Sequence, residues 1–82
     1  MNPRKTWARI ESGNLDIRFE DLLRLAHAFG CELARQRGSH HILVHAELQI
    51  MLNLQPAGAK AKRYQVRQLA AAVREHELRL RR

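Results

Sequence analysis

Two adjacent histidines, His40 and His41, follow a Gly-Ser pair and lead into an apolar run with the composition of a strand. The imidazole ring accepts and donates a proton near neutral pH, so either histidine could act as a general base. Farther along, a short basic segment supplies the cations Lys60, Lys62, Arg63 and Arg67. A proton-transfer group and a set of phosphate-binding cations are the residue types that RNA cleavage requires.

RNA cleavage of this kind needs little else. A base removes the proton of a ribose 2′-hydroxyl, the oxygen attacks the adjacent phosphorus in line, and cations stabilise the charge on the phosphoryl oxygens. The sequence therefore predicts a reaction without metal and without cofactor. A metal site is disfavoured because His41 and His45 would lie roughly 13 Å apart along a strand. A serine triad is disfavoured because Ser39 has no orienting acid at a readable spacing.

Alternation along the expected strand divides its side chains between two faces. One face holds His40, Ile42 and Val44, and the other holds His41, Leu43 and His45. If Ile42 and Val44 face the helices, then His41 and His45 lie on the open face and His40 lies beside the turn. Alternation does not choose between His40 and His41, and an ordinary structural role for both rings stays open.

The apolar pattern predicts three helices and three strands around these residues. The helices cover Pro3–Glu11, Phe19–Phe29 and Gln65–Leu80, and the strands cover Cys31–Gln36, Ser39–His45 and Gln49–Gln55. Gly30 is placed to cap the second helix, and Asn14 and Asp16 are its candidate N-caps. A sheet with one apolar face needs a cover, so we expect a two-layer α+β domain in the order α-α-β-β-β-α, helices on one face and the other face open.

Length, cysteine content and charge narrow the class of protein. The 82 residues suffice for one small domain, and the single cysteine, Cys31, indicates a reduced protein in which it is a buried hydrophobe. No apolar run approaches the ~20 residues that span a bilayer, so we expect a cytoplasmic protein without a membrane partner. The net charge is +7, and residues 58–82 hold eight basic against two acidic side chains. This excess favours a polyanion as partner, the alternative being a solvated helix face and a frayed Arg79–Arg82 tail.

Several segments resemble the HicA family of bacterial toxins. The resemblance rests on Gly38–Ile42 followed by His45, on Leu52–Pro56, on Lys60–Lys62 and on Tyr64–Leu69, and it extends from Phe19 to Glu77. It implies a double-stranded-RNA-binding-domain-like fold and the activity of an mRNA interferase, an endoribonuclease that a HicB antitoxin sequesters. On this basis residues 1–82 form one domain with an N-terminal extension (1–14), a HicA-like core (15–78) and a basic tail (79–82). The extension would shield the sheet or contact a partner.

The resemblance also implies roles for individual residues. The histidine of the family's Gly-Ser-His motif is catalytic, which by motif position is His40, and the doubled histidine keeps His41 as a second candidate. The RNA-binding residues are expected to be Ser39, Lys60, Lys62, Arg63, Tyr64 and Arg67. Tyr64 could stack on a base, although burial against the sheet is the favoured role for this residue. The chain departs from many HicA toxins at His45-Ala46-Glu47-Leu48, where they carry His-Pro and a glycine-containing turn.

Two other classes of function compete with a nuclease. Trp7–Asn14 followed by Phe19–Ala26 is similar to the later helices of phage-repressor-type helix-turn-helix proteins, which read DNA in the major groove. That alternative leaves the Gly-Ser-His motif and the strands unexplained. A non-catalytic RNA-binding domain would use the same cations but needs no imidazole beside the phosphate groove. The histidines therefore distinguish a nuclease from a binding domain.

Overall fold

The computed structural model describes residues 1–81, and within them three helices, a three-stranded antiparallel sheet and a two-stranded antiparallel sheet are formed. The elements are α1 (Pro3–Glu11), α2 (Phe19–Ala28), β1 (Cys31–Arg37), β2 (His40–His45), β3 (Met51–Leu54), β4 (Pro56–Ala57), β5 (Lys60–Ala61) and α3 (Arg63–Glu75). The predicted α+β class and the order α-α-β-β-β-α are confirmed. The short β4–β5 hairpin adds to that order, in a segment for which the sequence predicted neither a helix nor a strand.

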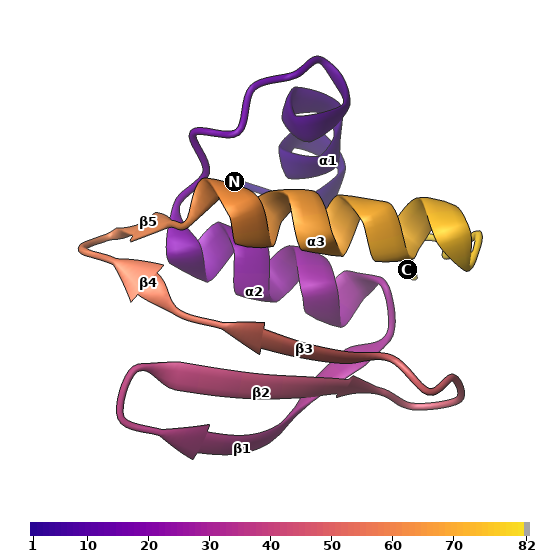
Figure 1. The fold of residues 1–82 in the computed structure, drawn as a ribbon. Helices are drawn as coiled ribbons and strands as arrows, with labels where there is room; N and C mark the ends of the chain where they lie inside the picture. Colours follow the sequence, from indigo (N-terminus) through magenta and orange to yellow (C-terminus); the bar gives the residue numbers. More distant parts are fainter. Residues whose placement is uncertain (82) are drawn as a thin grey trace.

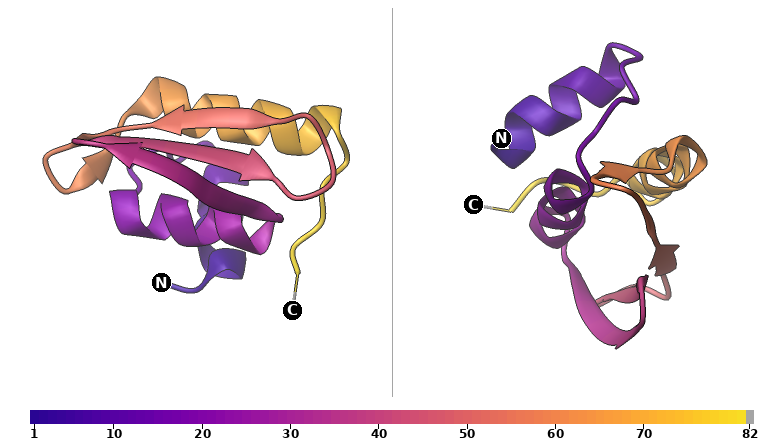
Figure 2. Two further views of the ribbon diagram at one scale, coloured as in Figure 1. Left: turned by 90° about the horizontal axis from the view of Figure 1, so that it is seen from below. Right: turned by 90° about the vertical axis from the view of Figure 1, so that its left-hand side faces the viewer.

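The three-stranded sheet has the order β1-β2-β3, and each neighbouring pair is antiparallel. Helices α2 and α3 lie side by side across one face of it, and the opposite face carries no helix (Figures 1 and 2). The core between the layers includes Leu22 and Leu25 of α2 and Val66 and Leu69 of α3, none of which is exposed to solvent. The predicted placement of the helices on one face is thus confirmed.

The covered face of the sheet carries Leu43 rather than its neighbours Ile42 and Val44. Leu43 is 3% exposed, whereas Val44 is 36% exposed. The cause lies in β3, where Leu52 and Leu54 are buried and Leu52 stands directly opposite Leu43. Directly opposed residues share a face, so the clear alternation of β3 determines the orientation of β2. Of the two orientations that alternation left open, the structure therefore has the one in which Leu43, and not Ile42 and Val44, faces the helices.

Helix α2 ends at its predicted glycine cap, whereas helix α3 differs from the predicted helix at both ends. Helix α2 ends near Gly30, whose φ of 98° is the left-handed conformation expected of a C-terminal glycine cap. Helix α3 begins at Arg63 and ends at Glu75, and Glu77 with φ of 52° turns the chain away. Leu80 still packs against the core, but from the tail. The position of Leu80 fits the helical period of the preceding apolar residues, which is why the sequence extended the helix to it, but α3 ends five residues earlier, at Glu75.

Helix α1 packs behind α2 and α3, on the side away from the sheet (Figure 2). It buries Thr6 and Ile10, and the Trp7 ring meets the edge of Phe29 with ring centroids 5.1 Å apart. The Arg74 guanidinium lies 5.8 Å from the centre of the Trp7 ring. The N-terminal extension therefore covers helices, and the expectation that it shields the sheet was wrong.

Residues 15–18 join the β4–β5 hairpin as an additional extended segment. The Ala61 N–H donates to the Ile17 carbonyl at 2.8 Å, and Arg18 pairs with Lys60 in an isolated antiparallel bridge. Neither expected N-cap serves α2, because the capping position is Arg18 and its side chain makes no cap hydrogen bond. The chain before α2 is held by the hairpin instead.

The C-terminal tail returns to the end of α2. The Arg81 N–H donates to the Ala28 carbonyl at 2.6 Å, and the Arg81 guanidinium lies 3.0 Å from the Glu47 carboxylate. Residue 82, the last of the predicted basic tail, lies outside the described residues. Cys31 is 1% exposed, as predicted, and burial raises the pKa of its thiol. Among the described residues, no helix has the length and apolarity needed to cross a membrane.

Candidate functional site

One end of the sheet gathers the residues that the sequence singled out. The β1–β2 turn, the end of β3, the β4–β5 hairpin and the first turns of α2 and α3 all lie at this end, on the left of Figure 1. Gly38 at the turn has φ of 58°, which suits the first central position of a tight hairpin turn. The turn presents Ser39 and the two histidines at the entry of β2.

His41 lies on the covered face and is half-buried. Its Nδ1 is 2.9 Å from the Ser39 carbonyl oxygen, and its ring meets the edge of Phe19 with centroids 4.9 Å apart. Because a carbonyl oxygen only accepts hydrogen bonds, Nδ1 carries the proton and Nε2 keeps its lone pair in the neutral ring. In its neutral form the His41 ring therefore presents an unprotonated Nε2 that is able to accept a proton.

His40 lies on the open face and is exposed. Its Nδ1 is 3.3 Å from the Asn53 Oδ1 atom on β3, and it stands opposite Arg37 on β1. The amide oxygen accepts, so His40 also keeps Nε2 unprotonated in its neutral form. The structure thus separates the two adjacent histidines onto opposite faces of the sheet.

A chain of side-chain hydrogen bonds links the histidine turn to α3. Lys62 Nζ donates to Gln55 Oε1 at 3.1 Å, and Gln55 Nε2 donates to Ser39 Oγ at 3.2 Å. Of the predicted site residues, Ser39 and Lys62 are brought together in this way. Gln55 was not singled out from the sequence, because a glutamine at a strand end gives no signal of its own.

Gln65 is a second residue that the sequence analysis did not recognise. Its side chain is 4% exposed and hydrogen bonds to the backbone of Asn53 and of Gln55 at the end of β3. The available signal was a polar residue in a helical stripe that otherwise holds Val66, Leu69, Ala70 and Val73. A buried amide needs partners, and a glutamine in such a stripe marks a place to look for them.

The predicted cations differ in whether their charge is already paired with an acidic group of the protein. Lys60 Nζ lies 3.0 Å from an Asp16 carboxylate oxygen, so its charge is shared with the protein itself. This hydrogen bond, the Lys60 charge and the more distant Arg9 and Arg63 hold the pKa of Asp16 below its usual range. Arg63 and Arg67 are exposed and lie one helical turn apart on α3, so both side chains leave the same face of the helix.

The first turn of α3 is the more positive of the two helix starts at this end. Lys62 occupies its N-cap position, and its first turn holds no acidic residue. The first turn of α2 holds Glu20 and Asp21. Because unpaired N–H groups and the helix dipole favour anions at a helix N-terminus, α3 is the better place for a phosphate.

Tyr64 is exposed, so the expectation that it is buried against the sheet was wrong. Its side chain is 52% accessible to solvent, and its hydroxyl lies 3.3 Å from Gln65 Nε2. The buried stripe of α3 begins one residue later, at Gln65, which turns Tyr64 outward. Its ring is available for stacking beside the cations.

Two further features lie apart from the histidine turn. His45 is a structural residue whose Nδ1 accepts hydrogen bonds from the Glu47 and Leu48 backbone N–H groups at 3.0 and 3.1 Å.

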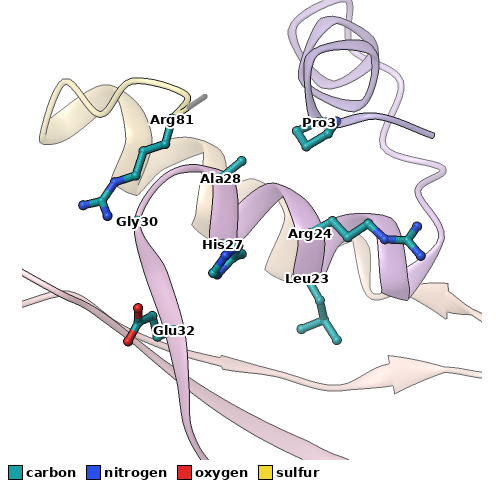
Figure 3. A pocket seen from close by; sticks show the side chains of 8 residues that line it. All are labelled: Pro3, Leu23, Arg24, His27, Ala28, Gly30, Glu32 and Arg81. Atoms are coloured by element: carbon teal, nitrogen blue, oxygen red, sulfur yellow. The ribbon is translucent and has the colours of Figure 1, made fainter.

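A cavity of about 590 Å³ near the end of α2 is lined by side chains that include His27 and Glu32 (Figure 3). Within residues 1–81, no group of three or more His, Cys, Asp or Glu side chains is close enough to hold a metal ion.

The fold and the site define a class: a small α+β domain with histidines at the entry of its middle strand and cations at the start of its last helix. Residues 19–74 match the model of a family described as HicA toxin of bacterial toxin-antitoxin. The chain therefore belongs to the HicA toxin family. The match spans α2 through most of α3 and stops short of α1 and the tail. No curated protein and no solved structure matches the chain.

Proposed function

We propose that this toxin is a metal-independent endoribonuclease that cleaves mRNA with a histidine as general base, and that a HicB-like antitoxin neutralises it. Membership of the HicA family gives the toxin role within a toxin-antitoxin system. The single observation that carries the catalytic part is the geometry of His41. Its ring is fixed by Ser39 and Phe19 with an unprotonated Nε2, at the end of the sheet where the cations of α3 begin.

The geometry supports His41 as the base ahead of His40, which the motif position ranked first. His41 lies on the same side of the sheet as α2 and α3, whereas His40 projects from the open face. Phe19, against which His41 packs, is the first residue of α2 and donates its N–H to the Ala59 carbonyl next to Lys60. His41 therefore has cations on its own side, and His40 is kept as the second candidate.

The proposed reaction needs only groups of this chain, the RNA itself and solvent water. The base takes the proton from a 2′-hydroxyl, the 2′-oxygen bonds to phosphorus, and the bond to the 5′-oxygen of the next nucleotide breaks. The departing 5′-oxygen takes up a proton from water, and the base later releases its proton to solvent. The products are a 2′,3′-cyclic phosphate and a 5′-hydroxyl. The cations that would hold and stabilise the phosphate are Lys60, Lys62, Arg63 and Arg67, while Tyr64 would stack on a base.

The decisive experiment incubates the purified protein with a short labelled RNA, with and without EDTA. We expect cleavage that EDTA leaves unchanged, and products with cyclic phosphate ends. The matched control is the same oligonucleotide with 2′-deoxyribose at the cleaved position, which lacks the attacking group and should stay intact. Cleavage that requires a divalent ion, or that proceeds at the deoxy position, would exclude this mechanism.

A non-catalytic RNA-binding domain is the second candidate, and the exposed Arg63 and Arg67 are the observation in its favour. It predicts that RNA binds and is released intact. No observation favours the helix-turn-helix alternative, since α2 lies within the HicA match and packs its apolar side on the sheet. We also propose a cytoplasmic location and a HicB-like protein as partner. Co-purification of the toxin with the product of an adjacent small reading frame would test the partner.

A further inference from the structure

Gln65 is a buried polar residue that the proposed reaction does not use. It belongs to α3 and is 4% exposed, among apolar side chains that have no hydrogen bonds to offer it. Taking an amide out of water costs free energy unless both its oxygen and its nitrogen find partners. The partners that Gln65 does find all lie at the histidine end of the sheet.

The Gln65 amide takes the place of a neighbouring strand beside β3. Its Oε1 accepts from the Gln55 backbone N–H at 2.8 Å, and its Nε2 donates to the Asn53 carbonyl at 2.9 Å. An N–H and a C=O two residues apart point to the same side of a strand, where the next strand would pair with them. One side chain of α3 therefore holds the outer edge of β3 by both of these backbone groups.

The two residues held in this way are the ones whose side chains touch the histidine turn. The Asn53 Oδ1 atom lies 3.3 Å from Nδ1 of His40. Gln55 Nε2 donates to Ser39 Oγ at 3.2 Å, and the Ser39 carbonyl is the group that fixes His41. His40 is thus connected to the Gln65 amide through Asn53. His41 is connected to it through Gln55 and the Ser39 of the turn.

The same strand end also receives the first cation of α3. Lys62 Nζ donates to Gln55 Oε1 at 3.1 Å, and Lys62 precedes Gln65 by three residues. We infer that Gln65 is a positioning residue of this site: its amide sets the spacing between the histidine turn and the cationic start of α3. The inference rests on the proposed function, since spacing matters for catalysis only if a phosphate is held while a proton is moved.

The first test replaces the amide by a side chain of similar volume without its hydrogen bonds. Gln65→Met should lower the single-turnover rate of RNA cleavage by about 10- to 100-fold, because small displacements of reacting groups cost that much. RNA affinity should change by less than about threefold, because the phosphate-binding cations are all present. The matched control is Gln68→Met on the exposed side of the same helix, which should cleave like the wild-type protein.

Two further variants distinguish a positioning role of Gln65 from a merely structural one. Val66→Ala removes apolar contacts from the core next to Gln65 without touching its hydrogen bonds, so it should lower Tm while leaving the cleavage rate of the folded protein near wild type. Gln65→Glu provides a pH readout. Its carboxyl can accept from the Gln55 N–H at any pH, but it can donate to the Asn53 carbonyl only when protonated.

The rate of Gln65→Glu relative to wild type should therefore rise as the pH falls, while the relative rate of Gln65→Met stays flat. Two titratable groups face position 65. One is the Tyr64 hydroxyl, and the other is the Lys62 ammonium, which reaches the end of β3 from the start of α3 and bonds to Gln55 there. Burial favours the protonated form of the introduced carboxyl and Lys62 the ionised form. Taking the ratio to wild type removes the titration of the histidines themselves.

The last measurement does not depend on cleavage. In Gln65→Met the Gln55 amide proton should exchange faster with solvent, and the ring resonances of His40 and His41 should shift. Unchanged exchange and unchanged ring resonances, or wild-type cleavage by Gln65→Met, would overturn the inference. If the wild-type protein itself leaves RNA intact, the proposed nuclease function fails, and the exchange and ring measurements then judge the Gln65 contact by itself.

Discussion

The histidine end of the sheet and the α1 layer behind the helices are held in place by different kinds of contact. At the histidine end, side-chain amides and Lys62 bond to specific atoms of β3 and the turn. In the α1 layer, Trp7 and Ile10 pack against α2 and its end through apolar and aromatic surfaces. Hydrogen bonds have narrow ranges of distance and angle, whereas apolar packing is non-directional. The first region is therefore built to fix positions, and the second to add stability.

The two regions also differ in their relation to the family. The histidine end lies within the match to residues 19–74, and α1 lies outside it. This leads to a simple expectation. Changes at the histidine end should alter chemistry with modest effects on stability, and changes in the α1 layer should do the reverse.

The largest effect is expected from His41→Ala. Loss of the proposed base should lower RNA cleavage by about 10²- to 10⁴-fold, while circular dichroism shows a folded protein because the half-buried ring lies at the end of the sheet. His76→Ala, at an exposed histidine after α3, is the control and should cleave normally. Retained cleavage in His41→Ala together with lost cleavage in His40→Ala would assign the base to His40.

Trp7→Ala should show the opposite behaviour. Removing this half-buried ring from its contacts with Phe29 and Arg74 should lower the free energy of unfolding by about 2 kcal/mol, as measured by urea denaturation. The cleavage rate of the folded protein should stay within about twofold of wild type, because the contacts of Trp7 lie at the C-terminal ends of α2 and α3, away from the first turns of these helices at the histidine end. Trp7→Phe keeps an aromatic ring and should recover most of the stability. A large loss of activity in a stably folded Trp7→Ala would contradict the division between the regions.

Charge reversal offers a matched pair of variants in the two regions. Arg63→Glu with Arg67→Glu should weaken RNA binding and flatten its dependence on log salt by about 1.4, the value for two lost contacts to single-stranded RNA. Arg4→Glu with Lys5→Glu makes the same change of net charge on exposed residues of α1. Because α1 lies away from the site, this control should keep the wild-type slope. Equal slopes for both double variants would mean that the α3 cations are only a solvated face.

The smallest effect concerns Asp16, which contacts both regions: its backbone carbonyl accepts from the Arg9 guanidinium of α1 at 3.2 Å, and its carboxylate pairs with Lys60. Because the pKa of Asp16 is lowered in the folded protein, its contribution to stability is complete above the unfolded-state pKa and is lost as pH falls through the folded-state pKa. An NMR titration of its carboxyl carbon should show the lowered pKa, and Lys60→Met should return it toward its ordinary range. Asp16→Asn should free Lys60 and strengthen RNA binding slightly at low salt. An unaltered titration in Lys60→Met would show that the ion pair does not form in solution.

The parts of the fold that follow from one element's own pattern could be predicted from the sequence. In the sequence Leu52 and Leu54 alternate with Met51 and Asn53, and this period of two favours one buried face, on which the structure buries both leucines. Gly30 likewise predicted the end of α2. The orientation of β2 could not be predicted, because Ile42, Leu43 and Val44 are all apolar and only the register with β3 decides among them. That orientation determines which histidine lies on the side of the helices. The ranking of His40 and His41 therefore depended on the register between β2 and β3, which the sequence of β2 alone does not contain.

The hydrogen-bond network at the site could not be predicted from the sequence for a related reason. Gln55 and Gln65 lie in segments that carry the family resemblance, but nothing in those segments gives either glutamine a role. Their roles come from the approach of α3 to the edge of β3. The outward direction of Tyr64 was missed because it lies just before the first buried residue of the helix. The residue types needed for chemistry could be found from the sequence, but the groups that hold them could not.

The extended segment 15–18 has a consequence for how the domain is delimited. Ile17 accepts from the Ala61 N–H, and Arg18 pairs with Lys60, so this segment completes a ribbon that would otherwise have only the two short strands β4 and β5. An isolated two-stranded ribbon is marginal in water, and its free edge is a place where a strand of another molecule can add. A chimera cut at residue 19, where the family match begins, would create that edge beside Lys60. We therefore expect a transferable unit of this toxin to need residues 15–18 as well as the residues of the family match.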